Sequence, residues 1–410
     1  MTDIPHFVLG AVTNLVMSFG AFLIVLTIVV TIHEMGHFLM AKSFGVAIDR
    51  FAIGFGRPIF SRVDKSGVEW RIGSLPFGGY VRFSGDADAS SSVPDAEDLN
   101  DLRQQVIRQQ GADALRRYFH FKPIYQRALV VAAGPAANFV LSVFLFTIFA
   151  ATIGVTVTPP RVAGVNPGSA AAAAGLEKGD LITSVDGHSI KDFNGLVEYV
   201  SLRAGDSLTV TFDRAGATKS VVLTPRRVTV TDRLTHRTMQ VGQIGVQSLG
   251  NPTRVQLAPT EAVGWGVGET WNIVSTTVTY LGRIVTGKEP ANQLSSFLGM
   301  AQTAGSLVKD GADSSNNLQG KAAVVAFNLL SFTALVSTAV GFMNLLPVPV
   351  LDGGHLVFYA YEAVAQRPLG AKFQAASYRI GLALLVGLML FATWNDIQQR
   401  SIFNLLGLSS

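Results

Sequence analysis

The stretch TIVVTIHEMGHFLMAKSFG, Thr27 to Gly45, places two histidines and a glutamate inside a run of apolar residues. The segment from Ile4 to His33 contains no Asp, Glu, Lys or Arg. About 20 such residues are enough to cross the hydrocarbon core of a bilayer. An ionisable side chain at that depth costs about 2.5–3.5 kcal/mol or more. The sequence therefore predicts a membrane-spanning helix whose polar residues have partners.

Three more uncharged runs follow along the 410 residues, at Ala128–Pro160, Ala322–Leu351 and Ile380–Trp394. The last run is short and spans only if Arg379 extends its charge to the headgroups, so a buried core helix is the alternative. Apolar residues make up 49% of the chain and charged residues 15%. These values favour a polytopic α-helical membrane protein with four transmembrane helices.

The distribution of basic residues predicts the orientation. The segment 41–127 holds thirteen Lys and Arg, and the residues before the first span hold none. Basic segments favour the cytoplasm, so we expect both termini and the segment 161–321 outside, which is the periplasm if the membrane is a bacterial inner membrane. The N-terminus lacks the basic region of a cleavable signal peptide. The chain has no cysteine, so we expect no disulfide and no thiolate metal site. The net charge of +4 is small for this length and carries no inference about nucleic acid, and we expect no nucleic-acid partner.

His33-Glu34-Met35-Gly36-His37 has the H-E-x-x-H pattern. Residues four apart lie on one face of a helix, so both imidazoles can reach one Zn²⁺. Glu34 lies beside them and is placed to take a proton from the attacking water. The alternatives are a polar patch packed against another helix and a proton path in a transporter. Four spans without an internal repeat argue against the transporter.

A catalytic zinc needs a third protein ligand. Asp352 is the one acid near the end of the third uncharged run, and the first and third spans run in the same direction, so it arrives in the same leaflet as His33 and His37. Pro347 and Pro349 break the helix before it. A helix N-cap is the alternative role for Asp352, and His355 is a less favoured ligand.

Asn344 lies about two turns before Asp352 in the same span. It is a candidate for holding a peptide carbonyl or the oxyanion of the transition state. The alternative is an interhelical hydrogen bond.

Three motifs together resemble the site-2 protease family, and within it the bacterial regulator-of-sigma-E proteases. They are HEMGH in the first span, AAGPAANF (132–139) in the second and NLLPVPVLDGGH (344–355) in the third. The resemblance implies an intramembrane zinc endopeptidase with His33, His37 and Asp352 as zinc ligands and Glu34 activating the water. It implies single-pass transmembrane proteins as substrates, such as an anti-sigma factor or remnant signal peptides, and allows for an upstream site-1 protease that acts first.

The segment Glu69–Asp86 is rich in Gly and aromatic residues and predicts strands with a tight turn. A soluble hairpin is one interpretation. The family instead has a membrane-reentrant β-loop here, which starts near Phe55–Pro58 and pairs with an unwound substrate strand. We therefore name four glycines as substrate-binding candidates: Gly54, Gly56, Gly78 and Gly79.

The segment Val162–Arg227 alternates short β-like runs with Gly-rich turns around one helical stretch, about 193–203. It resembles a PDZ domain, for which we expect a role as a substrate-size filter; a β-rich spacer without a ligand is the alternative. Pro259–Gly287 predicts an amphipathic helix, 290–320 a polar segment and 86–113 a solvated loop with some helix.

The expected fold is thus four transmembrane helices, a re-entrant β-loop and one periplasmic PDZ domain. The expected function is a membrane-embedded zinc protease that contacts the bilayer, with a PDZ scaffold or chaperone holding a structural zinc as the alternative. The expected segments are a first transmembrane helix (1–40), a cytoplasmic and re-entrant region (41–127), a second transmembrane helix (128–155), the PDZ domain (156–228), a periplasmic region with the amphipathic helix (229–321), a third transmembrane helix (322–346), the LDGGH loop and helix (347–371), a fourth transmembrane helix (372–395) and a periplasmic tail (396–410).

Overall fold

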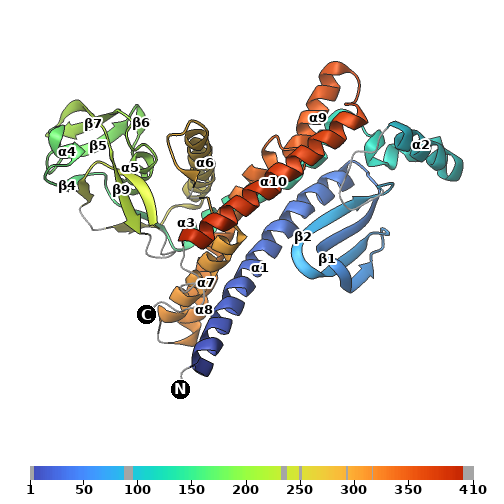
Figure 1. The fold of residues 1–410 in the computed structure, drawn as a ribbon, viewed down its shortest axis with the longest axis horizontal. Coiled ribbons are helices and arrows are strands. Elements are labelled where there is room, and N and C mark those ends of the chain that lie inside the picture. Colours follow the sequence, from blue (N-terminus) through green and yellow to red (C-terminus); the bar gives the residue numbers. More distant parts are fainter. Residues whose placement is uncertain are drawn as a thin grey trace. The chain divides into compact units, whose positions relative to one another are not determined.

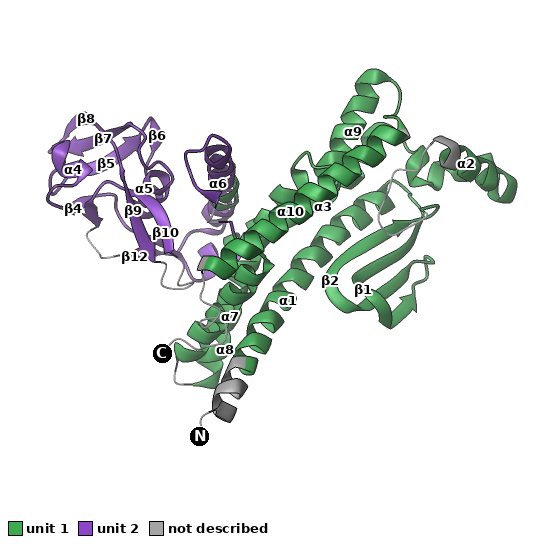
Figure 2. Cartoon of the chain, in the orientation of Figure 1, with its two compact units in different colours: residues 1–146, 269–274, 295–410 green, residues 147–268, 275–294 purple. Residues whose placement is uncertain are grey.

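The computed structural model describes residues 4–86, 96–231, 238–248, 252–291, 294–315 and 317–399. The chain divides into two compact units (Figure 2), which are described separately. Unit 1 comprises residues 1–146, 269–274 and 295–410, and unit 2 comprises 147–268 and 275–294. Most of the predicted tail, 396–410, lies outside the described residues.

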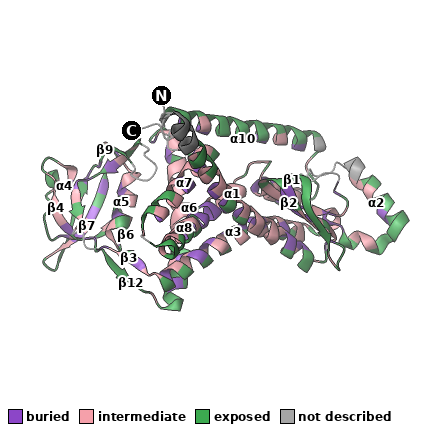
Figure 3. Cartoon of the chain, turned by 90° about the horizontal axis from the view of Figure 1, so that it is seen from below, coloured by how far each residue is buried: buried purple, intermediate pink, exposed green. Residues whose placement is uncertain are grey.

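Four helices are long and apolar enough to cross a membrane, which confirms the prediction of four spanning helices. They are α1 (Ile4–Ser43), α3 (Ile124–Thr152), α8 (Leu318–Leu345) and α10 (Ala371–Gln399). Apolar side chains along α10 are exposed (Figure 3), as expected of a helix that faces lipid. Length and composition support this membrane assignment, and family membership adds to it below.

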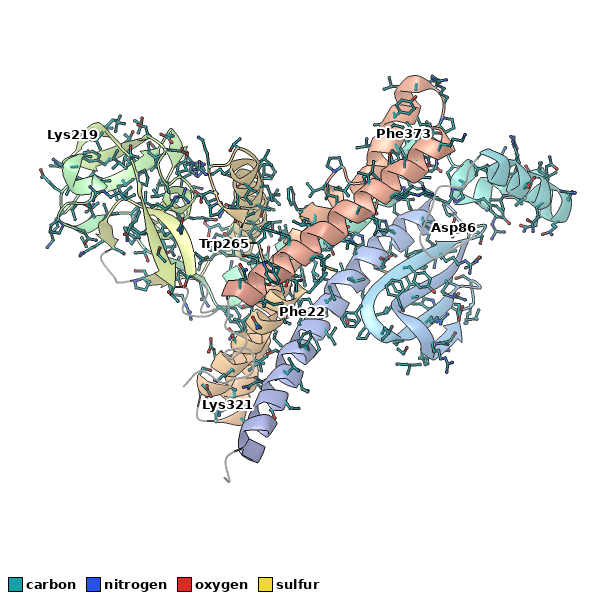
Figure 4. All side chains as sticks on the ribbon, in the orientation of Figure 1. Phe22, Asp86, Lys219, Trp265, Lys321 and Phe373 are labelled. Atoms are coloured by element: carbon teal, nitrogen blue, oxygen red, sulfur yellow. The ribbon has the colours of Figure 1, made fainter. Side chains whose placement is uncertain are left out.

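The helix α7 (Phe297–Asp313) was not expected, because the sequence around it is polar and rich in small residues. Ser296 caps its first turn by accepting from the N–H of Leu298. Buried Ala301 and Ala304 face a core that includes Phe22 and Val25 of α1. The Phe22 ring, labelled in Figure 4, lies 6.0 Å from the ring of Phe297. Small residues on α7 therefore allow close packing against α1.

Two long strands, β1 (Ile48–Val63) and β2 (Glu69–Phe83), pair in antiparallel register beside α1 (Figure 1). The segment 69–86 contains a strand and a tight turn at Ser84–Gly85, where the N–H of Asp86 donates to the carbonyl of Phe83. The turn that joins β1 to β2 lies outside this segment, at 64–68, where Asp64 accepts from the N–H groups of Ser66 and Val68. Each strand bends and pairs twice. The first half of β1 pairs with both halves of β2, which gives the segment order 79–83, 48–53, 69–73 and 58–63.

Glycines make these bends possible. Gly54 and Gly78 have φ values of 79° and 100°, which side chains with a Cβ rarely adopt. The sheet exposes several large apolar side chains toward its far end, with exposed fractions from 44% to 73%: Phe55, Ile59, Phe60, Val63, Ile72, Leu75 and Phe77. Water-facing sheets normally carry polar residues on such a face.

The remaining elements of unit 1 are α2 (Ala96–Gln110), two short 3₁₀ helices η1 (Ala112–Arg117) and η2 (Phe119–Phe121), and α9 (Asp352–Ala365). The helix α9 follows the proline-containing segment after α8 and ends at Gln366, which has left-handed backbone angles. The sequence motif DGGH therefore forms the first turn of α9.

Unit 2 is built around a four-stranded sheet with the order β6-β5-β7-β8. Its core includes Ile182, Leu196, Leu208 and Phe212, all almost fully buried. The strands are β3 (Val155–Val157), β4 (Val162–Val165), β5 (Leu181–Val185), β6 (His188–Ser189), β7 (Leu208–Arg214), β8 (Ala217–Leu223), β9 (Arg226–Thr231), β10 (Thr238–Gln243), β11 (Val246–Ser248) and β12 (Thr253–Val255).

Three helices accompany these strands: α4 (Ala170–Ala173), α5 (Phe193–Ser201) and α6 (Pro259–Val285). The core of unit 2 extends beyond the predicted segment 156–228, since it contains Ile244 and β11 pairs with β4. The strand β12 pairs with β3 and brings Thr253 next to Val157. The segment that contains the sheet thus begins at β3 and ends at β12, two strands that pair with each other.

Candidate metal centre

Three potential ligand atoms converge where α1 meets the start of α9. Nε2 of His33 lies 3.2 Å from Nε2 of His37. Oδ2 of Asp352 lies 3.1 Å from the first nitrogen and 3.5 Å from the second. The two histidines are one helical turn apart on α1, and Asp352 comes from a segment more than 300 residues later. Among the described residues, these three form the one group of histidines and acids arranged to hold a metal ion.

The spacing of these atoms fits a zinc ion. A tetrahedral Zn²⁺ with bonds of about 2.0–2.1 Å separates its ligand atoms by about 3.3 Å, close to the three distances observed. Asp352 Oδ2 is buried and makes no hydrogen bond with any described residue, although both imidazoles are near. A buried carboxylate oxygen without a hydrogen bond is unfavourable unless a cation satisfies it. The donor set of two imidazoles and one carboxylate is also one that catalytic zinc uses.

The helix α3 supports both histidines from behind without supplying a ligand. Nδ1 of His37 lies 2.9 Å from the carbonyl oxygen of Val130, to which it can donate only when protonated. That bond leaves Nε2 free to bind a metal. A Cβ at Gly134 would overlap the His37 imidazole, and one at Gly36 would overlap the carbonyl of Ala133. Glycine at these two places therefore lets α1 and α3 approach closely enough to make the contact.

The first turn of α9 fixes Asp352. A Cβ at Gly353 or Gly354 would overlap the main chain of residues 345–349, so both glycines allow the preceding segment to fold back. Further along α9, Glu362 accepts from Arg127 at 2.7 Å, and the Arg127 guanidinium lies 4.9 Å from the centre of the Tyr359 ring. These contacts attach α9 to the start of α3, so the same helix supports all three ligands.

A cavity of about 600 Å³ opens beside the three ligand atoms. One wall is the edge segment of β2, with Gly79, Tyr80, Val81 and Phe83. Another wall comes from α10, through Ala375, Tyr378 and Leu382. Asp86, labelled in Figure 4 at the end of β2, forms an ion pair of 2.8 Å with His120, and both residues line the cavity. The cavity is therefore apolar for most of its wall, with polar groups near the ligand atoms and near this ion pair.

Glu34 lies on the cavity wall between the ligands and the edge of β2. The main-chain N–H of Val81 lies near its carboxylate. A Cβ at Gly79 would lie 3.1 Å from Cγ of Glu34, so glycine leaves room for the carboxylate. This arrangement places one carboxylate that is not a ligand next to the site where a metal would bind.

With this geometry in place, comparison with known proteins identifies the family. The profile of peptidase family M50 matches residues 21–388, which is most of the chain. The chain belongs to peptidase family M50, the site-2 proteases.

Relatives of this M50 peptidase agree with that result. The chain is 44% identical over 385 residues to metalloprotease MmpA of Caulobacter vibrioides, covering 94% of this chain and 96% of the relative. It is 38% identical over 379 residues to a protein of Agrobacterium fabrum named as a zinc metalloprotease, covering 92% and 94%. A similarly named protein of Campylobacter jejuni is 31% identical over 384 residues, covering 93% and 94%. The chain is therefore a membrane-embedded site-2 metalloprotease that uses zinc.

The structure brings together some of the other predicted site residues of the M50 peptidase but not all. Asn344 and Gly79 line the cavity. Gly54, Gly56 and Gly78 are not among its lining residues; they adopt positive φ at the bends of the sheet, where Gly54 faces the main chain of Leu75. Their substrate-binding role stays a prediction, and the structure gives them a conformational one. His355 lines the cavity near the hydroxyl of Tyr378 and is outside the ligand group.

Sequence reasoning missed several groups at the site. Asn138 of α3 lies beside His33, and its amide is the single Asn or Gln within the uncharged run 128–160. That isolation was a usable signal, because an amide inside a spanning helix normally has a specific partner. The main-chain groups of Val130 and Val81 carry no signal in the sequence, because any residue supplies them. Tyr378 lay in a segment considered only as a span.

Proposed function

We propose that this M50 zinc metalloprotease cuts transmembrane segments of single-pass membrane proteins within the plane of the bilayer. The observation that carries the proposal is the position of His33 and His37 on α1, a helix that is long and apolar enough to span a membrane. His33 lies ten residues before the end of α1 at Ser43, about 15 Å along the helix axis. Peptide bonds that reach such a site belong to substrate segments within the membrane.

Glu34 is the proton-transferring group in this proposal. Zinc, when bound by His33, His37 and Asp352, supplies a Lewis acid that polarises the scissile carbonyl and acidifies water. The Glu34 carboxylate takes the proton of the attacking water and delivers it to the leaving amine. Val81, whose N–H lies near that carboxylate, lines the same cavity. Asn344, on the wall of the same cavity, is placed to donate its amide to the substrate carbonyl.

The edge of β2 gives an unwound substrate its hydrogen-bond partners. The segment 79–83 pairs with 48–53 on one side, and within the described residues no strand pairs with its other side. Gly79, Tyr80 and Val81 of this segment line the cavity, so we place its open side toward Glu34. A transmembrane helix must unwind before its peptide bonds can be cut, and its freed N–H and C=O groups need partners in a dry environment. A strand added at this edge would meet that need beside Glu34.

The large apolar side chains exposed on both faces of the β1–β2 sheet support contact with lipid rather than with water. We propose that the sheet enters the membrane as a re-entrant loop. Replacement of Ile59 and Phe60, which are 73% and 52% exposed, by Ser should weaken insertion without disturbing a buried core. Lipid-accessible labels placed at these two positions in reconstituted bilayers would test the proposal, because protection from water-soluble quenchers is expected.

A zinc-content and cleavage assay on Glu34→Gln separates the protease from a membrane scaffold with structural zinc. The variant should keep one zinc per chain and lose about 10²–10⁴-fold or more in cleavage of a tagged transmembrane peptide. The matched control is Glu177→Gln, an exposed acid of unit 2 that does not line the cavity. Wild-type protein that holds zinc but cuts no transmembrane peptide would favour the scaffold, and full activity in Glu34→Gln would exclude the role given to Glu34.

We further propose that unit 2 acts as a PDZ-type filter that excludes substrates with bulky domains on its side of the membrane. A four-stranded sheet with the helix α5 supports this assignment. The pairing of β3 with β12 allows a clean deletion, because Val157 and Thr253 are adjacent and a short Gly-Ser linker can join them. The deletion of 159–251 should release cleavage of an untrimmed substrate and leave cleavage of the trimmed one unchanged. Unchanged discrimination would end the filter proposal while leaving the protease proposal intact.

The proposed orientation places unit 2 in the periplasm and the segment 41–127 in the cytoplasm of a bacterial inner membrane. The absence of cysteine makes single introduced cysteines unique targets. Lys219→Cys, on exposed β8, should react with a membrane-impermeant thiol reagent in intact spheroplasts. Arg116→Cys, on exposed η1, should react only after lysis. The opposite pattern would reverse the orientation.

A further inference from the structure

We infer that Asn138 of α3 is a positioning residue for the metal centre, which holds the His33 imidazole in the orientation that presents Nε2 to zinc. The Asn138 side chain is fully buried, and its amide nitrogen Nδ2 lies 3.2 Å from Nδ1 of His33. The carbonyl of Val130 lies next to Nδ1 of His37 in the corresponding place, about two turns earlier on the same helix. The inference concerns zinc binding, so it does not depend on the proposed substrate.

The chemistry of the imidazole decides which atom of Asn138 must face it. When Nε2 of His33 binds a metal, its lone pair is committed there and Nδ1 carries the proton. Nδ1 then needs a hydrogen-bond acceptor, and the amide oxygen Oδ1 of Asn138 can supply one. Oδ1 is buried and has no hydrogen-bond partner among the described residues, while Nδ2 faces the ring. The two ends of an amide have nearly the same shape, so a half-turn of the side chain exchanges them.

With Nδ2 toward the ring, Nδ1 accepts a hydrogen bond, which suits an imidazole that carries its proton on Nε2. The half-turn gives the arrangement suited to zinc, in which Nδ1 donates to Oδ1. An amide is one of few side chains that can serve both states, because it carries a donor and an acceptor. A leucine, which has the same number of side-chain heavy atoms, can serve neither, and an aspartate serves the zinc-bound state.

The backbone of Asn138 is held firmly enough for this role. Its carbonyl oxygen accepts from Ser142 of α3 at 3.0 Å and from Ser337 of α8 at 2.9 Å. Ser142 also donates to the carbonyl of Ala334. All three polar side chains are completely buried. The main chain of Asn138 on α3 is thus attached to α8, while its side chain points to α1. Packing alone does not require an amide at this position.

The test compares three variants by zinc affinity in chelator competition and by the visible spectrum of the Co²⁺ form. Asn138→Leu removes the acceptor, Asn138→Asp keeps it, and Ser337→Ala removes a hydrogen bond of the same interface without touching His33. We expect Asn138→Leu to bind zinc about 10–100-fold more weakly with an altered Co²⁺ spectrum. The zinc affinity of Asn138→Asp should lie within about threefold of the wild-type value. The zinc affinity of Ser337→Ala should equal that of wild type.

Three results would overturn the inference. They are wild-type zinc affinity in Asn138→Leu, equal losses in Asn138→Leu and Asn138→Asp, and equal losses in all three variants. If Asn138→Leu does not fold, the zinc-loaded wild type decides through histidine ¹⁵N resonances, where His33 must show a protonated Nδ1 and a metal-bound Nε2. Normal zinc binding in a chain that cuts no transmembrane peptide would contradict the proposed function and would not affect this inference.

Discussion

Asp352 of unit 1 and Asp180 of unit 2 are both withdrawn from water, but their surroundings differ in kind. The Asp180 side chain is 1% exposed, and both of its oxygens accept from Arg214, at 2.7 and 2.8 Å. Its Oδ2 also accepts from the N–H of Glu177. The Asp352 side chain is 18% exposed and faces two imidazoles, and its buried Oδ2 has no hydrogen bond among the described residues.

This difference separates a structural acid from a ligand. A buried carboxylate that is fully hydrogen-bonded adds to the stability of its unit. A buried carboxylate oxygen that faces other lone pairs destabilises the metal-free protein and is satisfied only by a cation. The environment, rather than the residue type or the extent of burial, therefore predicts which acid matters for catalysis. Four predictions test this contrast.

The largest effect is expected for Asp352→Ala. Loss of one ligand should abolish stoichiometric zinc, and with it several kcal/mol of transition-state stabilisation, which is about a thousandfold or more in rate. Metal analysis and peptide cleavage measure these losses. The thermal unfolding midpoint of the metal-free protein should not fall, because Oδ2 has no hydrogen bond with any described residue to lose. A variant that retains one zinc per chain would remove Asp352 from the ligand set.

A smaller loss is expected for Gly134→Ala, because the added Cβ overlaps the His37 imidazole and must push it away from its place. Zinc affinity should fall by about 10–100-fold. The matched control is Gly20→Ala on α1, where nothing lies within 4 Å of the added Cβ. Chelator competition measures the zinc affinity of both variants. Equal affinities would show that α3 shifts to make room for the added Cβ without moving the ligands.

Asp180→Asn should affect stability without affecting the metal centre. Loss of the charge weakens the paired hydrogen bonds to Arg214, and we expect the unfolding midpoint of unit 2 to fall by about 5 °C. Hydrogen exchange of peptides from β5 and β7 in the full chain measures the corresponding loss in the free energy of unfolding. Zinc affinity and cleavage of a short transmembrane peptide should match wild type. A loss of zinc in this variant would contradict the contrast between the two acids.

The smallest effect is a pH dependence of unit 2. Burial raises the pKa of Asp180, but the hydrogen bonds from Arg214 and Glu177 lower this pKa by a larger amount, so the pKa lies below its usual value. A lowered pKa in the folded state adds stability above the unfolded pKa of about 3.9, and this stability disappears as the pH falls through the folded value. The stability difference between wild type and Asp180→Asn should therefore be constant from pH 7 to about 5 and shrink below about pH 4.

Hydrogen exchange corrected for its intrinsic pH dependence checks this trend in the same peptides of β5 and β7. A difference that grows as the pH falls would mean that Asp180 is stabilised in its protonated form, which is opposite to the direction expected.

The sequence predicted the four long helices because an uncharged run of sufficient length has few other stable environments. It also singled out His33, His37 and Asp352, since their spacing and the parallel direction of two spans are properties of the chain. It did not locate the turn that joins β1 to β2, because glycines favour bends and turns alike. It missed α7, whose small residues gain helical stability only by packing on α1.

The sequence by itself determined which residues can bind zinc, because ligand chemistry and helical periodicity are local properties. Only the tertiary structure decided how those residues are held: the carbonyl of Val130 behind His37, Asn138 behind His33 and the N–H of Val81 near Glu34. Two of these three supports are main-chain groups, which every residue carries. Their role depends on where three distant segments meet, and that position is fixed by the packing of the whole unit.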